Sequence, residues 1–215
     1  MPVKIDSREY RKIDAAMMET RRDEEGRMVV EGYATTFNQP YELMRAKDVI
    51  VNEQVDAHAF DETDMSDTIM QYDHEGRVFA RVKNGTLQLT PDEHGLKVTA
   101  DLGGTEIGRQ LFEEISGGYT NKMSFGFTVT GEKKQRSKDE NGNTVILRTI
   151  TKVGRLYDVS AVSLPANDAT EISSRSIGDG LIAEVQEEVL AEQERLRRIG
   201  EIRKILNQGE LNHDV

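Results

Sequence analysis

The pattern of apolar and polar residues predicts a chain built mostly from β-strands. Residues 28–37, MVVEGYATTF, mix β-branched and aromatic side chains around Gly32, which is typical of a strand with a bulge or a close backbone contact. Residues 68–102 contain three turn signals, EG, NG and PDEHG, between runs rich in Val, Leu and Thr. We therefore expect an antiparallel meander over this range.

One helix interrupts the strands. In residues 104–118, GTEIGRQLFEEISGG, the apolar residues Ile107, Leu111 and Ile115 recur at every fourth position. Thr105 can cap the N-terminus of this helix, and the closing glycine pair can end it.

More strand patterns follow the helix. Residues 121–130, NKMSFGFTVT, alternate apolar and polar side chains, and residues 144–153 and 155–165 are rich in β-branched residues. Residues 131–143, GEKKQRSKDENGN, are charged and lack apolar side chains. We expect them to form a mobile connection between two strands.

The last part of the chain predicts a long amphipathic helix over residues 180–208, because apolar residues recur there at steps of three, four and seven. The charges of such a helix usually form a solvated face, although the spacing also fits pairing with another helix. The apolar positions are Leu181, Val185, Val189, Leu196, Ile199, Ile202 and Leu206.

The elements together predict an α+β fold that is mainly β. We expect an antiparallel β-barrel-like core with a few flanking helices, followed by the long C-terminal helix. The change of composition along the chain divides it into an N-terminal extension (1–27), one domain (28–176) and a charged helical extension (177–215).

Composition narrows the possible functions. The formal net charge of −11 repels phosphate backbones, so we expect no nucleic-acid partner. The chain has no cysteine, which excludes disulfides, zinc–thiolate sites and a thiol nucleophile. It also lacks a signal-peptide pattern and a membrane-spanning run, so we expect a cytoplasmic protein.

Ser124 is the first candidate for chemistry. Alternation along residues 121–131 directs Met123 and Phe125 into the core, so Ser124 is expected to face outward. Gly126, two positions later, would leave an open trough beside the hydroxyl. The pattern fits an alternative equally well, in which Ser124 and Thr128 are ordinary polar residues on a solvent-exposed face of the strand.

Histidine is the usual base for a serine nucleophile, and the chain has four. His213 lies in a polar tail, His94 in the turn PDEHG, and His58 in DAHAF, where packing on Phe60 would give it a structural role. His74 ends the strand pattern TIMQYD, where its side chain can turn toward a neighbouring strand.

Asp158 is a candidate third residue, because a Ser–His pair usually needs a group that orients the imidazole. An acidic residue inside the strand pattern RLYDVSAVS is disfavoured, and we expect it to face water. A metal site from His58, His74 and Asp73 is an alternative, although no close pair such as HExxH is present. Phosphate-binding and dinucleotide-binding glycine motifs are absent from the sequence.

Five segments, QYDHEG, GLKVTADL, the helix ending in ISGG, KMSFGF and LYDVSAVSLPANDATEI, follow one another in the order and spacing of a known family. The chain resembles the prohead (head maturation) serine proteases of tailed bacteriophages, which are related to the herpesvirus assembly proteases. The resemblance covers roughly residues 28–175, and MSFGF and VSLPAN are its most specific parts.

The resemblance implies a role for each candidate residue. His74 corresponds to the general base, Ser124 to the nucleophile and Asp158 to the acidic residue that orients the base. Many relatives carry glutamate at the position of Asp158. A histidine in the third role, as in the herpesvirus enzymes, would be His58 or His94. The resemblance implies no metal and no cofactor.

The resemblance also implies partners. Expected substrates are the major capsid protein with its scaffold domain and the protease itself, inside the assembling prohead in the host cytoplasm. A homo-oligomer is expected, and residues 180–208 would be a scaffold-like or targeting extension. Two rival hypotheses are a non-enzymatic capsid-assembly scaffold protein and a metal-dependent hydrolase.

Overall fold

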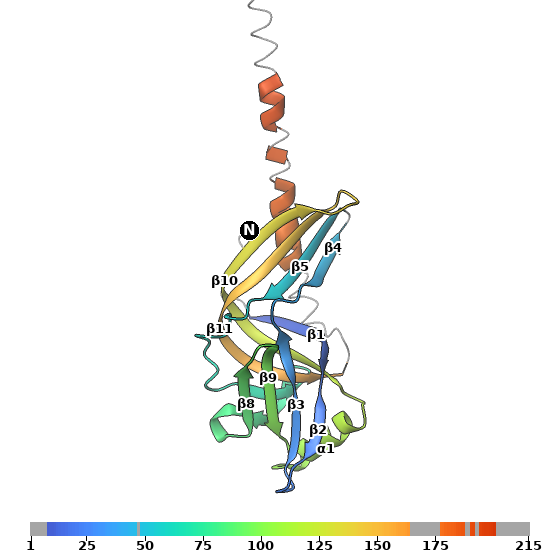
Figure 1. Cartoon of the computed structure of the whole chain (residues 1–215), viewed down its shortest axis with the longest axis vertical. Helices are drawn as coiled ribbons and strands as arrows, with labels where there is room; N and C mark the ends of the chain where they lie inside the picture. Colours follow the sequence, from blue (N-terminus) through green and yellow to red (C-terminus); the bar gives the residue numbers. More distant parts are fainter. Residues whose placement is uncertain (1–7, 47, 164–176, 188–189, 192–193, 201–215) are drawn as a thin grey trace, which may run out of the picture.

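The strands form two sheets, shown in the computed structural model of Figure 1. The structure describes residues 8–46, 48–163, 177–187, 190–191 and 194–200, without the side chains of residues 12–17. The seven-stranded sheet contains β1 (Glu9–Met17), β10 (Lys122–Lys138), β11 (Thr144–Val162), β5 (Val49–Val55) and β4 (Tyr41–Ala46) in that order, with β6 (Ile69–Tyr72) beside β11 and β7 (Glu75–Arg81) beside β6. The four-stranded sheet has the order β2 (Glu19–Arg22), β3 (Met28–Thr36), β9 (Gly95–Asp101) and β8 (Leu87–Pro91).

The long hairpin β10–β11 joins the two ends of the larger sheet. At the end that carries the turn, residues 144–150 of β11 pair with β5. At the open end, β10 pairs with β1 and β11 pairs with β6 (Figure 1). Both β5 and β6 run parallel to β11. The mainly β, α+β class is therefore confirmed. The predicted barrel-like antiparallel core is wrong, because the larger sheet contains both parallel and antiparallel pairs and the described strands form no closed barrel.

Two local predictions also need correction. Residues 131–138 continue β10 instead of forming a loose connection, and they pair with residues 144–152 of β11. A strand ladder satisfies backbone groups whatever the side chains are, so a charged segment can extend a hairpin. The expected meander is two separate hairpins, since β6–β7 lies in one sheet and β8–β9 in the other.

The predicted helix is confirmed, and it packs on the main apolar core. Helix α1 (Glu106–Ser116) begins at Thr105, whose side chain accepts a hydrogen bond from the Gly108 amide at 3.1 Å. It buries Leu111, Phe112 and Ile115 against a core that holds the apolar face of β10 and strands of both sheets. Each such burial contributes about 1.5–3 kcal/mol. A short 3₁₀ helix, η1 (Val82–Asn84), connects β7 to β8.

A second, smaller apolar cluster lies where the C-terminal segment packs beside β5 and the first half of β11. Ile177, Leu181 and Val185 of the C-terminal segment pack against a surface that includes Val49 and Ile146. The described residues 177–187, 190–191 and 194–200 are helical, and the remainder of the predicted helix lies outside the described residues. No described helix has the length and hydropathy to cross a membrane. The proposed division into three segments stays a prediction.

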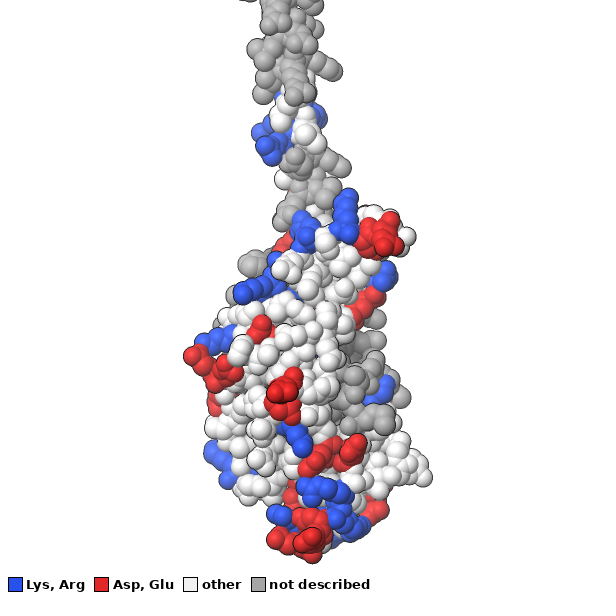
Figure 2. Space-filling view, viewed as in Figure 1, with Lys and Arg blue, Asp and Glu red and all other residues white. Residues whose placement is uncertain are grey.

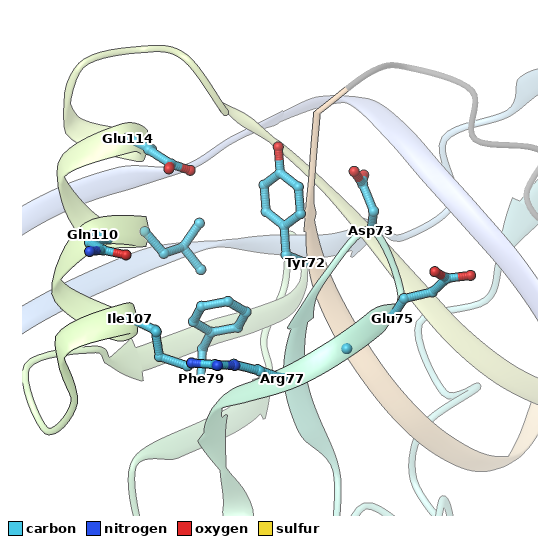
Figure 3. A pocket seen from close by; sticks show the side chains of 10 residues that line it. Tyr72, Asp73, Glu75, Arg77, Phe79, Ile107, Gln110 and Glu114 are labelled. Atoms are coloured by element: carbon cyan, nitrogen blue, oxygen red, sulfur yellow. The ribbon is translucent and has the colours of Figure 1, made fainter.

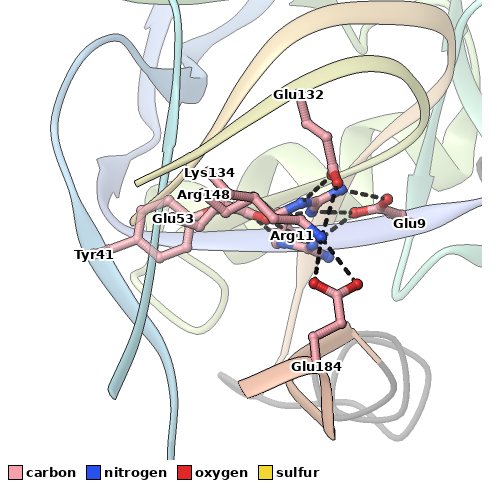
Figure 4. A network of polar contacts seen from close by, with 8 residues as sticks. All are labelled: Glu9, Arg11, Tyr41, Glu53, Glu132, Lys134, Arg148 and Glu184. Carbon is pink, nitrogen blue, oxygen red and sulfur yellow. Dashed lines mark hydrogen bonds and ion pairs between the residues drawn. The ribbon is translucent and has the colours of Figure 1, made fainter. Parts of the chain in front are cut away.

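A buried network of opposite charges fixes β1 against the sheet (Figure 4). Arg11 contacts Glu53 at 2.5 Å and Glu9 at 2.7 Å, and Arg148 contacts the same two carboxylates at 2.5 and 2.9 Å. Burial pushes the pKa of Glu53 upward, but the nearby guanidiniums of Arg11 and Arg148 outweigh it and hold the pKa at about 2. These contacts tie β1 to β5 and β11.

Charges on the surface are interleaved. On the face shown in Figure 2, Lys and Arg lie among Asp and Glu, most densely where the β2–β3 turn protrudes. One ion pair there joins Arg27 and Asp23 at 2.6 Å. Exposed pairs of this kind contribute little to stability.

Candidate active site

Ser124 lies on β10, opposite Lys12 of β1 on one side and Ser160 of β11 on the other. Its Oγ is 2.6 Å from Nε2 of His74 and 3.0 Å from the carbonyl oxygen of Arg11. The predicted outward-facing serine is wrong, because Ser124 is completely buried. Alternation along a strand separates two faces, but it does not report what covers the second one.

His74 occupies a strained turn at the tip of the β6–β7 hairpin. Tyr72 pairs with Glu75, which leaves Asp73 and His74 as the two turn residues, with φ angles of 48° and 62°. Positive φ at both positions is the condition of a type I′ turn, which usually requires Asn or Gly. The turn therefore needs support from its surroundings.

Asp73 supplies that support. Its carboxylate accepts hydrogen bonds from the amide and hydroxyl of Ser163, at 3.0 and 2.7 Å, and its own amide donates to the carbonyl of Ala161 at 2.9 Å. The turn is thereby attached to the end of β11. The side chain of His74 is 2% exposed and points back over the sheet toward Ser124.

Asp158 completes the chain of contacts. Its Oδ1 lies 2.5 Å from Nδ1 of His74 and accepts a hydrogen bond from the hydroxyl of Ser160 at 2.9 Å. The predicted exposure to water is wrong, because Asp158 is completely buried. Within the described part of the chain, Oδ2 has no hydrogen-bond partner, and the guanidinium of Arg8 lies 3.9 Å from it.

Gly126 does not leave an open trough. A Cβ at this position would lie 2.4 Å from Oδ2 of Asp158 and 2.8 Å from the ring of Tyr10. The Tyr10 ring also packs edge-on against the imidazole of His74, with 4.6 Å between centroids. Gly126 therefore provides room for the carboxylate and for the Tyr10 ring, which occupies the space that was expected to be an open trough.

The other histidines lie elsewhere. The side chain of His58 is 81% exposed and lies 3.1 Å from Asp61, so the predicted packing role is wrong. His94 packs against the ring of Tyr33 at 4.5 Å. His213 lies outside the described residues. Among the residues that are described, no group of three or more His, Cys, Asp or Glu side chains could hold a metal ion.

This geometry is suited to proton transfer. With Nδ1–H donating to Asp158, the lone pair on Nε2 of His74 can accept the proton of the Ser124 hydroxyl. The hydroxyl has one proton and two acceptors within reach, Nε2 and the Arg11 carbonyl, and Nε2 is the nearer. Such a hydroxyl can become a nucleophile.

Sequence reasoning named Ser124, His74 and Asp158, and the structure brings these three together. It missed Tyr10, Arg8 and Ser160, which surround them. The first two lie within the segment assigned to an N-terminal extension, and no local pattern connects them to residues more than a hundred positions later. Only the pairing of β1 with β10 does so.

Comparison with known proteins gives two matches. The family model described as caudovirus prohead serine protease matches residues 16–181. Among solved structures, the chain is similar to the capsid assembly protease of bacteriophage T4, with 10% sequence identity and a TM-score of 0.38, over 73% of this chain and 96% of that one. A TM-score this low does not establish a shared fold. No curated protein matches the chain.

Proposed function

The chain belongs to the caudovirus prohead serine protease family, and from this premise we propose that Ser124, His74 and Asp158 are the catalytic residues of an endopeptidase. The observation that carries the assignment is the continuous path of contacts from Asp158 through both ring nitrogens of His74 to Ser124, at 2.5 and 2.6 Å. These distances suit a general base that is already oriented.

The proposed reaction is acyl transfer. Nε2 of His74 takes the proton of Ser124 while Oγ attacks the carbonyl carbon of a peptide bond, and the imidazolium then protonates the leaving amine. Water, deprotonated by the same nitrogen, hydrolyses the acyl-enzyme and releases the acid. The carboxylate of Asp158 stabilises the imidazolium in both steps, and its burial strengthens that interaction.

Access to Ser124 requires movement. The nucleophile is completely buried, and the Tyr10 ring rests on its general base. The arrangement is therefore a closed form of the site, from which the side chain of Tyr10 is the described group best placed to withdraw. Surface loops and edge segments commonly open at low cost in free energy.

The proposed substrates follow from the family, which is one of prohead proteases. They are the major capsid protein with its scaffold domain, and the chain itself, within an assembling prohead. The C-terminal extension, residues 177–215, would be a scaffold-like or targeting segment. A homo-oligomer also remains part of this proposal.

A fluorophosphonate probe tests the assignment, because it reacts only with an activated serine. We expect labelling at Ser124, located by peptide mass spectrometry, and its loss in Ser124→Ala and His74→Ala. Ser66→Ala is the matched control, since Ser66 is an exposed serine whose amide and hydroxyl bond to Asp64. Unlabelled Ser124 in a folded chain that still cleaves protein would overturn the assignment, and a chain without either activity would favour a scaffold protein.

A further inference from the structure

A groove of about 650 Å³ lies beside the hairpin that carries His74 (Figure 3). Tyr72, Asp73 and Glu75, the immediate neighbours of His74 along the chain, form part of its wall. Helix α1 forms the opposite wall, and the chain runs from this helix into β10 and Ser124. The groove therefore lies against the hairpin that carries the proposed general base, and α1, its other wall, precedes the strand that carries Ser124.

The floor of the groove is apolar. Tyr72 and Phe79 from the hairpin face Ile107 from α1 (Figure 3). Leu111 of the same helix also lines the groove. Phe79 and Tyr72 are partly buried against the main core, so this surface is held in place by packing. It can hold the methylene groups of one long side chain, and its volume lies in the range of ordinary ligand sites.

A carboxylate stands at one end of this floor. Glu114 is exposed and, within the described part of the chain, has no side-chain hydrogen bond or ion pair. Glu75 on the hairpin is likewise exposed without such a partner. The carboxylate of Asp73 is bound by Ser163. Arg77, the one cation among the lining residues, lies beside Ile107, away from Glu114 (Figure 3).

We infer that this groove is a specificity subsite for a lysine or arginine side chain of the substrate polypeptide. The apolar stem of such a residue lies on Phe79 and Leu111, and its charged end reaches Glu114. Arg77 repels a second cation at the other end, which sets the direction of the side chain. The inference rests on the proposed function, because the groove can select a substrate side chain only if the neighbouring Ser124 and His74 cleave a polypeptide.

Cleavage of a peptide mixture tests the subsite. We would digest a bacterial lysate with chymotrypsin, incubate the peptides with the full-length protein and map new termini by mass spectrometry. We expect Lys and Arg to be enriched at one fixed position within about four residues of the cut. Glu114→Gln should lower that enrichment by roughly 1.5-fold to fivefold, the range for a solvated ion pair, and Glu114→Lys should favour Asp or Glu instead.

Glu113→Gln is the matched control. Glu113 is the adjacent residue on α1, but it pairs with Arg22 at 2.7 Å and does not line the groove. This variant should keep the wild-type preference. A wild-type profile without basic enrichment, or enrichment that Glu114→Gln and Glu114→Lys leave unchanged, would overturn the inference.

Binding separates this inference from the proposed function. Two fluorescent alanine-rich peptides, containing Leu-Lys or Leu-Glu at their centre, would be titrated into the Ser124→Ala protein and followed by anisotropy. We expect tighter binding of the lysine peptide, by roughly 1.5-fold to fivefold, and loss of the difference in Ser124→Ala/Glu114→Gln. Such binding, together with a wild-type protein that cleaves no peptide, would refute the protease and retain the subsite. Equal affinities would refute the subsite.

Discussion

Nε2 of His74, at the tip of the β6–β7 hairpin, lies 2.6 Å from Oγ of Ser124, fifty residues further along the chain on β10. Both side chains are buried, so their relative position is held by packing and by the attachment of the turn to β11. Preorganised contacts of this kind avoid the entropic cost of assembling a catalytic pair during the reaction.

Replacing Asp158 with Asn should remove nearly all activity and leave the fold intact. The amide would favour the wrong imidazole tautomer, because Nδ1 would no longer face a carboxylate at 2.5 Å. A loss of about 10⁴-fold in kcat is expected from the corresponding change in other serine proteases. Peptide hydrolysis measures the loss and circular dichroism checks the fold. Full activity would assign the third role to another residue.

Replacing Gly126 with Ala should disturb both stability and activity. The new methyl group would lie 2.4 Å from Oδ2 of Asp158, so the carboxylate must shift away from His74. Overpacking of this kind costs about 1–3 kcal/mol. Urea unfolding and serine labelling measure the two effects. Gly104→Ala is the control, because a Cβ there meets no atom within 4 Å. A stable, fully reactive Gly126→Ala protein would contradict the geometry.

Replacing Tyr10 with Ala should make Ser124 more accessible. The ring packs on His74 at 4.6 Å, and an aromatic pair contributes about 0.5–1.5 kcal/mol, so labelling of Ser124 by a fluorophosphonate should accelerate by about threefold to tenfold. Tyr119→Ala serves as the control, since Tyr119 is also a tyrosine but is 83% exposed. Unchanged or slower labelling in Tyr10→Ala would show that another group covers the serine.

Replacing Asp73 with Ala should misplace the base. The variant loses both hydrogen bonds to Ser163 and gains a residue that tolerates positive φ poorly. We expect kcat to fall by up to about 100-fold with little change in KM. Asp73→Asn should restore much of the activity, because its amide oxygen can accept the bond from the Ser163 amide, its NH2 can donate to the Ser163 hydroxyl, and Asn suits the turn. Equal losses in both variants would indicate a different role for the carboxylate.

The buried charge network predicts a pH dependence of stability. The pKa of Glu53 is about 2 in the folded chain and 4.5 as its ordinary value, so its contribution is complete above pH 4.5 and is lost as the pH falls toward 2. The difference corresponds to about 3 kcal/mol. Glu53→Gln should lower the free energy of unfolding at pH 7 by a similar amount and flatten its pH dependence in this window. Urea titrations at several pH values measure both, and an unchanged profile would refute the assignment.

The sequence alone determined most of the local structure. The period of four and the Thr105 cap located α1, and alternation correctly assigned Met123 and Phe125 to the core. These signals are local, because a helix or strand must present one apolar face to whatever core it joins. The residues of the site were named through family resemblance and not through periodicity.

Tertiary structure decided the surroundings of those residues. Ser124 and Asp158 are buried because the Tyr10 ring of β1 and the side chain of His74 lie on the face that alternation left polar. The sequence pattern also did not predict that β11 pairs in parallel with both β5 and β6. Nor did it predict that the β10–β11 hairpin continues through a charged segment. Backbone hydrogen bonds between strands far apart in the chain determine these pairings. Since nearly every residue type can form such bonds, a single sequence contains almost no information about which strands will pair.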